Sequence, residues 1–276
     1  MGRDPLAWLR SPCVMGVLNI TPDSFSDGGE HLACAAARLT IDRMAHDGAV
    51  ILDLGAESTR PGAERVSADE QLHRLAPLFA DLVRRPPAAA LSIDTTRAAV
   101  AAKAIDAGAV LINDVSAGRD DPDILGLVAE RDVAVCLMHM RGQPRDMQDD
   151  PRYTDVVAEV VGFLEERIAA AMAAGVPESR ILVDPGVGFG KTVAHNLALL
   201  SGLGRIRRLG RPVVVGLSRK GVVGLLTGRP IEGRLAGSIG GALAAVARGA
   251  DVIRAHDVGE TVDALRVWSA ISGGPS

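Results

Sequence analysis

Polar side chains follow eight short apolar runs of the sequence, at the point where each run ends. In chain order they are Asn19; Asp53 and Glu57; Asp94; Asn113 and Asp114; His139; Asp184; Ser218, Arg219 and Lys220; and Arg254 and His256. Carboxylate and amide oxygens accept hydrogen bonds, whereas Lys and Arg side chains donate them. Because the formal net charge is −4, any anionic ligand must be held by a local cluster of such donors.

The apolar runs predict the strands of a parallel sheet. They begin near residues 13, 49, 89, 110, 133, 181, 212 and 251, and each is continuously apolar, as strands covered on both faces tend to be. Helical patterns separate them, for example at 33–46, 68–84, 95–107, 155–174 and 239–248. This alternation favours an α/β fold, a single-domain (β/α)8 TIM barrel over residues 1–276, whose strand ends all meet on the catalytic face. A doubly wound open sheet is the alternative, and it would spread the same residues along one edge.

Composition limits the class of protein. The chain has 276 residues, of which 47% are hydrophobic, and its negative net charge does not suit nucleic-acid binding, which needs a basic surface. No apolar run approaches the ~20 residues of a membrane helix, and Asp4 and Pro5 interrupt the stretch that a signal peptide would need. We therefore expect a cytoplasmic protein with no nucleic-acid or membrane partner. The three cysteines form no CxxC pair, which argues against zinc and disulfides.

The stretch DPGVGFGKT at 184–192 looks like a nucleotide-binding loop but does not match one. A P-loop has four residues between its glycines, whereas three separate Gly186 from Gly190, and Pro185 lacks an N–H for a phosphate. The pattern GxGxxG fails too, because Lys191 stands in place of the third glycine. We expect these glycines to let the backbone approach a flat ligand beside Asp184.

Histidine spacing does not indicate a zinc enzyme. His31, His46, His73 and His195 have no paired spacing, and the motif HExxH does not occur. A hard ion such as Mg²⁺, held by one oxygen ligand and by substrate phosphates, stays open.

Eight motifs, in order over nearly the whole chain, resemble those of the dihydropteroate synthases. They are GVLNITPDSFSDGG, DLGAESTRPGA, SIDTT, LINDVSAG, LMHMRG, LVDPGVGFGKT, GLSRKG and IRAHDV. The resemblance implies a (β/α)8 barrel transferase of folate biosynthesis. Such enzymes join (7,8-dihydropterin-6-yl)methyl diphosphate to 4-aminobenzoate by an SN1-like substitution, forming 7,8-dihydropteroate and diphosphate. Mg²⁺, a homodimer and inhibition by sulfonamides are implied as well.

The resemblance implies a pterin-binding set. Its members are Asp94, Asn113, Met138, Asp184, Phe189, Gly216, Lys220 and Arg254. Asp94, Asn113 and Asp184 would accept hydrogen bonds from the guanidine-like edge of the pterin. An unpaired donor in a closed pocket costs about 1–3 kcal/mol, so rings without that edge would be rejected. Arg254 would stack on the ring and also reach the diphosphate, a dual role that lysine could not fill.

A second implied set holds the leaving group. The catalytic residues would be Asn19, Asp27, Arg60, Lys220, Arg254 and His256, and the diphosphate would be bound by Asn19, Thr59, Arg60, Arg254 and His256. Asn19 is also the expected Mg²⁺ ligand. Arg254, His256, Asn19 and the metal would stabilise the leaving charge as the C–O bond breaks ahead of amine attack, so no strong general base is needed.

The aminobenzoate set is implied in the same way. It comprises Phe25, Ser58, Thr59, Pro61, Ser218, Lys220 and Gly221. Phe25 and Pro61 would wall the ring, although Phe25 could instead be an ordinary loop anchor, and Ser218 or its neighbours would receive the carboxylate. The family usually has Ser or a bulkier residue where this chain has Gly221, so the contact there would come from a backbone N–H at a helix N-terminus.

Two other functions stay open beside the synthase. A methyltetrahydrofolate:corrinoid methyltransferase would share the pterin acceptors, but it has no diphosphate to bind, and the motifs STRPG, SRK and RAH together argue against it. A non-catalytic pterin-binding paralogue is disfavoured because all the matching site residues are present. The segment 228–234 resembles the part of the family that forms the dimer.

Overall fold

Eight parallel strands form the centre of the protein. The computed structural model describes residues 6, 9, 11–20, 29–58 and 62–273. The strands are β1 (Cys13–Asn19), β2 (Ile51–Gly55), β3 (Ala90–Asp94), β4 (Ala109–Asp114), β5 (Ala134–Met138), β6 (Ile181–Asp184), β7 (Val214–Gly216) and β8 (Val252–Ala255). Each begins within two residues of its predicted start.

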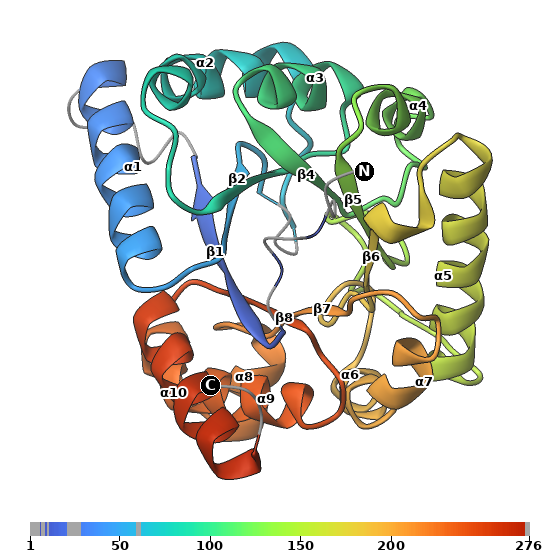
Figure 1. Ribbon diagram of the computed structural model, residues 1–276. Coiled ribbons are helices and arrows are strands. Elements are labelled where there is room, and N and C mark those ends of the chain that lie inside the picture. The colour runs from blue at the N-terminus through green and yellow to red at the C-terminus, as the bar shows by residue number, and fades with distance from the viewer. Residues whose placement is uncertain (1–5, 7–8, 10, 21–28, 59–61, 274–276) are drawn as a thin grey trace.

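The sheet closes into a barrel. The strands are hydrogen-bonded in the order β6-β5-β4-β3-β2-β1-β8-β7, and a parallel bridge between Val183 and Val213 joins the two remaining edges. Figure 1 looks along the axis of this ring and shows the helices around it. The fold is therefore the predicted (β/α)8 TIM barrel, and the open sheet is excluded.

Helices follow the strands along the chain. They are α1 (Gly29–His46), α2 (Ala68–Arg84), α3 (Ala98–Asp106), α4 (Asp123–Glu130), α5 (Val156–Ala173), α6 (Val193–Ser201), α7 (Leu203–Arg207), α8 (Gly221–Thr227), α9 (Leu235–Val246) and α10 (Val258–Ser272), with 3-10 turns η2 (Glu178–Arg180) and η3 (Ile231–Gly233). The predicted helix at 95–107 starts too early. Thr95 lies in a buried turn, where its hydroxyl donates to Gln71 and accepts from the N–H of Arg97.

The inner face of the barrel has an apolar layer at one end and a polar layer at the other. A buried cluster consists of Cys13, Met15, Ile51, Leu111, Ala134, Cys136, Leu182, Val214 and Val252, with Leu6 and Leu9 packed against it. Because side chains alternate between the two faces of a strand, the residue two positions later points inward as well. Those residues include Asp53, Asn113, Met138, Asp184, Gly216 and Arg254. The polar groups thus lie directly above this buried apolar cluster, which we call the dry floor of the barrel.

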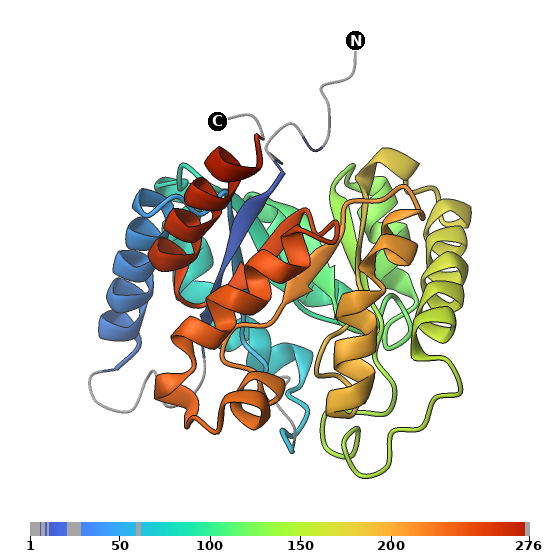
Figure 2. The ribbon, with the colours of Figure 1, turned by 90° about the horizontal axis from the view of Figure 1, so that it is seen from below.

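The outer face of the strands packs against the helices. Leu52, Leu54, Ile93, Ile112 and Val135 are among the buried members of this larger core. In the side view of Figure 2, the start of β1 and the end of α10 lie at the same end of the barrel. The polar ends of the strands lie at the other end. None of the described helices is both long enough and apolar enough to span a membrane.

Candidate active site

A buried network joins four strands inside the barrel. The carboxylate of Asp53 on β2 accepts hydrogen bonds from the Ser92 hydroxyl (2.6 Å), the Asn113 amide (2.9 Å) and Nε of Arg254 (2.7 Å). Nη2 of Arg254 donates in turn to Asp94 (2.8 Å). Since the Asn113 nitrogen is directed at Asp53, its side-chain oxygen faces the other way as an acceptor. Asp53 therefore orients both Asn113 and Arg254.

Burial sets the electrostatics of this network. It raises the pKa of Asp94 to about 7, although the nearby Arg254 charge opposes the shift. Burial also disfavours the charge of Arg254, but the carboxylates of Asp53 and Asp94 outweigh it and raise the pKa of Arg254 above its ordinary value. Arg254 thus stays positively charged, whereas Asp94 changes its charge near neutral pH.

Asp184 ends β6, and Lys220 lies after β7, directly before α8. Nζ of Lys220 donates to the carbonyl of Val187 (2.6 Å) and lies 4.6 Å from the centre of the Phe189 ring. Burial lowers the pKa of Lys220 to about 8, and burial raises that of Asp184. One Asp184 oxygen accepts the N–H of Gly186 at 2.7 Å. The pair places a donor and an acceptor beside the Arg254 network.

Gly216 lies close to both Lys220 and Arg254. A side chain at Gly216 would begin 3.5 Å from Nζ of Lys220 and 3.7 Å from Cβ of Arg254. Gly216, Lys220 and Arg254 are therefore neighbours, as the pterin-binding set requires.

An apolar wall stands beside the polar groups. It consists of Val115, Met138, Met140, Met147 and Phe189, which form a small buried cluster of their own. Met138 and Phe189 are members of the predicted pterin set, and a flat ring would pack against such a surface.

A second polar group lies at the ends of β1, β7 and β8. The Ser218 hydroxyl lies 3.1 Å from Nδ1 of His256 and accepts the backbone N–H of His256 at 3.2 Å. Asn19 ends β1, and a side chain at Gly55, the last residue of β2, would begin 3.4 Å from Oδ1 of Asn19 and 3.5 Å from Cβ of Asp94. Gly55 thus leaves room for Asn19 to lie beside the Arg254 network.

The expectation for the 184–192 glycines is wrong for Gly186 and Gly190. A Cβ on Gly186 would lie 1.8 Å from the His139 carbonyl oxygen, and one on Gly190 would lie 2.1 Å from that of Arg141. Both have positive φ (68° and 63°), a conformation that glycine adopts without strain. Gly186 and Gly190 therefore make room for the backbone of the β5–α5 loop.

Lys191 fixes the same loop from inside. Its buried Nζ donates to the carbonyls of Gly186 and Phe189 (2.9 Å each) and lies 2.9 Å from Nδ1 of His139. Burial, followed by the charge of Lys191, lowers the pKa of His139 to about 2. His139 is thus a neutral acceptor, and Lys191 is a structural residue with no phosphate to bind.

Five predicted residues, Phe25, Asp27, Thr59, Arg60 and Pro61, lie outside the described part of the chain. Ser58 is the last described residue before the undescribed stretch 59–61. Gly221 is exposed at the first position of α8. The aminobenzoate roles of these two and of Ser218 stay predictions.

The geometry suits a ligand with a donor-rich flat edge and an anionic group. Acceptors come from Asp94, Asn113 and Asp184, and cationic donors come from Lys220 and Arg254. Among the described residues, no group of three or more His, Cys, Asp or Glu side chains could hold a metal ion. The Mg²⁺-binding role expected of Asn19 stays a prediction.

Comparison with known proteins identifies the family. Residues 15–256 match the family described as pterin binding enzyme. The dihydropteroate synthase of Haemophilus influenzae is 43% identical over 262 residues, covering 95% of this chain and 94% of that protein. The chain belongs to the dihydropteroate synthase family.

Solved structures of dihydropteroate synthases agree with this assignment. That of Xanthomonas albilineans with 4-aminobenzoic acid is 51% identical, with a TM-score of 0.88 over 96% of this chain and 94% of that one. That of Yersinia pestis in a sulfonamide drug complex is 44% identical, with a TM-score of 0.89 over 96% and 95%. The barrel described above is the fold of these dihydropteroate synthases.

Sequence reasoning missed Asp53 as a member of the dihydropteroate synthase site. Asp53 is fully buried and holds two of the predicted pterin residues, but it was noted only as a polar residue near a strand end. One signal could have revealed it: Asp53 stands two positions after Ile51, in the same register as Asn113 after Leu111 and Arg254 after Val252.

Proposed function

We propose that this protein is a dihydropteroate synthase, which joins (7,8-dihydropterin-6-yl)methyl diphosphate to 4-aminobenzoate and forms 7,8-dihydropteroate and diphosphate in folate biosynthesis. The observation that carries the proposal is the buried Asp53–Arg254–Asp94 network with Asn113, set in the barrel mouth beside Asp184 and Lys220. The matching relatives bear the name of this enzyme.

The pterin is bound by its donor-rich edge. Asp94, Asn113 and Asp184 accept its N–H groups, and Lys220 donates to the ring nitrogen or carbonyl side. The apolar wall around Met138 and Phe189 covers the ring. Each buried donor left unpaired would cost about 1–3 kcal/mol, which makes the site selective for this edge.

The reaction is a substitution at the pterin methylene. The C–O bond to diphosphate breaks and its electrons stay on the leaving oxygen. The neutral amine of 4-aminobenzoate then forms the C–N bond and releases a proton to solvent or to diphosphate. Arg254, His256 and Asn19, with Arg60 and Thr59 from the β2–α2 loop, stabilise the leaving charge. Asp27, from the loop after β1, belongs to the same catalytic set. No general base is required, because the amine is nucleophilic when neutral.

Asn19, half-buried at the end of β1, would be the protein ligand of a Mg²⁺ ion bound together with the diphosphate. Such an ion would neutralise charge on the leaving diphosphate.

The second substrate binds at the mouth of the barrel. Phe25 and Pro61 wall the aminobenzoate ring, while Ser58, Thr59, Ser218, Lys220 and the N–H of Gly221 lie around its carboxylate. A sulfonamide resembles aminobenzoate in shape, so it competes for the same place.

We also propose that the protein is a cytoplasmic homodimer. Leu225 and Leu226 on α8 are 74% and 58% exposed, and Ile231 in the following turn is 41% exposed. Neighbouring exposed apolar side chains of this size are typical of an interface. Light scattering should give twice the chain mass, and Leu225→Glu should give the mass of one chain.

The function is tested by incubating the protein with the dihydropterin diphosphate, 4-aminobenzoate and Mg²⁺, and by following diphosphate and dihydropteroate. We expect both products in equal amounts, each dependent on aminobenzoate. Absence of aminobenzoate-dependent product would refute the synthase. Methyl transfer from methyltetrahydrofolate to a corrinoid would instead favour the methyltransferase, and pterin binding without turnover would favour the silent paralogue.

A further inference from the structure

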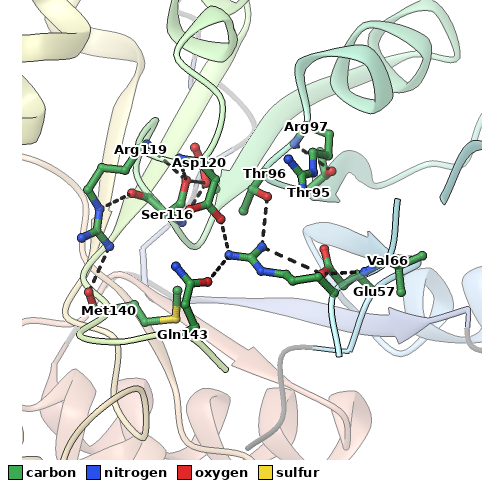
Figure 3. Close-up of polar contacts among 12 residues, drawn as sticks. Glu57, Val66, Thr95, Thr96, Arg97, Ser116, Arg119, Asp120, Met140 and Gln143 are labelled. Carbon is green, nitrogen blue, oxygen red and sulfur yellow. Dashed lines mark hydrogen bonds and ion pairs between the residues drawn. The ribbon is translucent and has the colours of Figure 1, made fainter. Parts of the chain in front are cut away.

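The β2–α2 loop is tied to its neighbours by one arginine. Arg65 lies near the end of this loop, and its guanidinium is surrounded by Glu57, Thr96, Asp120 and Gln143. Figure 3 labels these four partners. These partners come from four different βα loops: Glu57 from its own, and the others from those after β3, β4 and β5. The side chain of Arg65 therefore joins four loops at the mouth of the barrel.

The contacts use the planar fork of the guanidinium. Nη1 lies 3.3 Å from the Thr96 hydroxyl and 3.9 Å from Oε1 of Glu57. Nη2 donates to the Asp120 carboxylate and, at 2.6 Å, to the side-chain oxygen of Gln143. A lysine ammonium could not reach all of these places at once, because it has one nitrogen and no fork.

The partners of Arg65 are themselves held firmly. The N–H of Asp120 donates to the Ser116 hydroxyl, and that hydroxyl donates to the buried carboxylate of Asp114 at 2.7 Å. Arg119 ties the same turn to the Met140 carbonyl at 3.0 Å. The turn that carries Asp120 is therefore held by hydrogen bonds of its own, independently of Arg65.

The β5–α5 loop is fixed in a similar way. The backbone of Gln143 closes a turn with Asp146 and Met147, and the N–H of Gly62 donates to the Pro144 carbonyl at 2.9 Å. Gly62–Pro144 and Arg65–Gln143 are therefore two parallel ties between the same two loops.

A separate set of hydrogen bonds joins the start of the β2–α2 loop to the start of α2. Glu57 accepts the N–H of Val66 and the amide of Gln71 (3.1 Å each), and Gln71 accepts the Thr95 hydroxyl at 3.0 Å. These bonds do not involve Arg65. Loss of Arg65 would therefore free the stretch around Gly62 and leave the helix start in place.

We propose that Arg65 is a positioning residue, a clasp that holds the β2–α2 loop against the loops after β3, β4 and β5 and thereby sets the affinity for the second substrate. The inference rests on the proposed function, which assigns an aminobenzoate contact to Ser58 of this loop. Arg65 itself touches neither substrate. Its partners adjoin the pterin site, because Thr96 follows Asp94 by two residues and Gln143 follows Met140 of the apolar wall by three.

Steady-state kinetics of Arg65→Met test the proposal. The substitution keeps the apolar stem and removes every contact of the fork. We expect the KM for 4-aminobenzoate to rise about tenfold, the effect of ~1.4 kcal/mol, while kcat and the KM for the pterin diphosphate change less than about twofold. Arg65→Lys should fall between wild type and Arg65→Met.

Arg131→Met is the matched control. Arg131 pairs with Asp106 and is similarly exposed (33%, against 29% for Arg65), but it lies after α4, at the opposite end of the barrel. It should leave both KM values unchanged. An unchanged aminobenzoate KM in Arg65→Met, or an equal rise in both KM values, would overturn the proposal.

Amide hydrogen exchange separates failure of the clasp from failure of the proposed function. In Arg65→Met, and not in Arg131→Met, the N–H of Gly62 should exchange about tenfold faster, whereas Val66 stays protected because Glu57 still holds it. Unchanged exchange at Gly62 would refute the clasp whatever the kinetics. If the wild type makes no dihydropteroate, the proposed function fails, and faster exchange would still establish the clasp as a loop anchor.

Discussion

Replacing Asp53 should show how the active-site arginine is held. The Asp53 carboxylate is fully buried and accepts from Ser92 through one oxygen and from Asn113 and Arg254 through the other. Asp53→Asn can keep all three contacts, because its amide oxygen can face Asn113 and Arg254 while the Ser92 hydroxyl rotates to accept from the amide nitrogen. Asp53→Ala removes all three.

The two substitutions therefore differ in magnitude. Asp53→Asn replaces the ion pair with Arg254 by a hydrogen bond from the guanidinium to a neutral amide oxygen, a loss of about 1–1.5 kcal/mol in the free energy of unfolding. Asp53→Ala leaves Arg254 with one carboxylate partner and leaves the Asn113 nitrogen unpaired, a loss of about 3–5 kcal/mol. At ~2–4 °C per kcal/mol, the melting temperature should fall by about 3 °C in Asp53→Asn and by about 12 °C in Asp53→Ala.

Urea denaturation followed by far-UV circular dichroism measures both losses, and Ser92→Ala is the control. That change removes one neutral donor and leaves Arg254 and Asn113 paired, so it should cost about 1 kcal/mol. Equal stability of Asp53→Ala and Asp53→Asn would refute the reasoning, because it would mean that Asp53 does not hold the guanidinium.

Three further outcomes follow from the site. In the proposed function Asp94 binds the pterin when ionised and Lys220 binds it when protonated. The value of kcat/KM for the pterin diphosphate should therefore rise as pH passes about 7 and fall above about 8. Lys220→Arg should abolish the fall, and a fall that persists in this variant would show that another group causes it. Arg254→Lys keeps the charge but cannot bridge two carboxylates, so kcat/KM should drop about a hundredfold; near-normal turnover would contradict its assigned role. Lys191→Met should cost about 3 kcal/mol of stability, because the carbonyls of Gly186 and Phe189 lose their donor; unchanged urea denaturation would contradict the structural role of Lys191.

The barrel could be predicted from the sequence because its signal is local. Runs such as that near residue 181 are apolar throughout, since one face of each strand meets the helices and the other meets the dry floor. Helix starts were less certain. The helix expected from Thr95 begins at Ala98, because Thr95 finds a partner in Gln71, a contact that local pattern cannot reveal.

The site could be predicted only in part. Asn113 and Arg254 were found through their motifs, but the residue that joins them, Asp53, lies 60 and 201 positions away from them in sequence. The glycine loop was misjudged for the same reason, since Gly186 and Gly190 face the backbone of another loop. Contacts between distant loops depend on the closed ring, which no single motif encodes.

The alternation of side chains inside the barrel restricts how this protein can change length. Inserting or deleting one residue between Ile51 and Asp53 would turn the carboxylate outward, into the helix layer, and would bring Leu52 or Leu54 into the mouth of the barrel. The same holds for the stretches that precede Asn113 and Arg254. Length variation compatible with the site is therefore confined to the loops, and the strands can vary only by substitution.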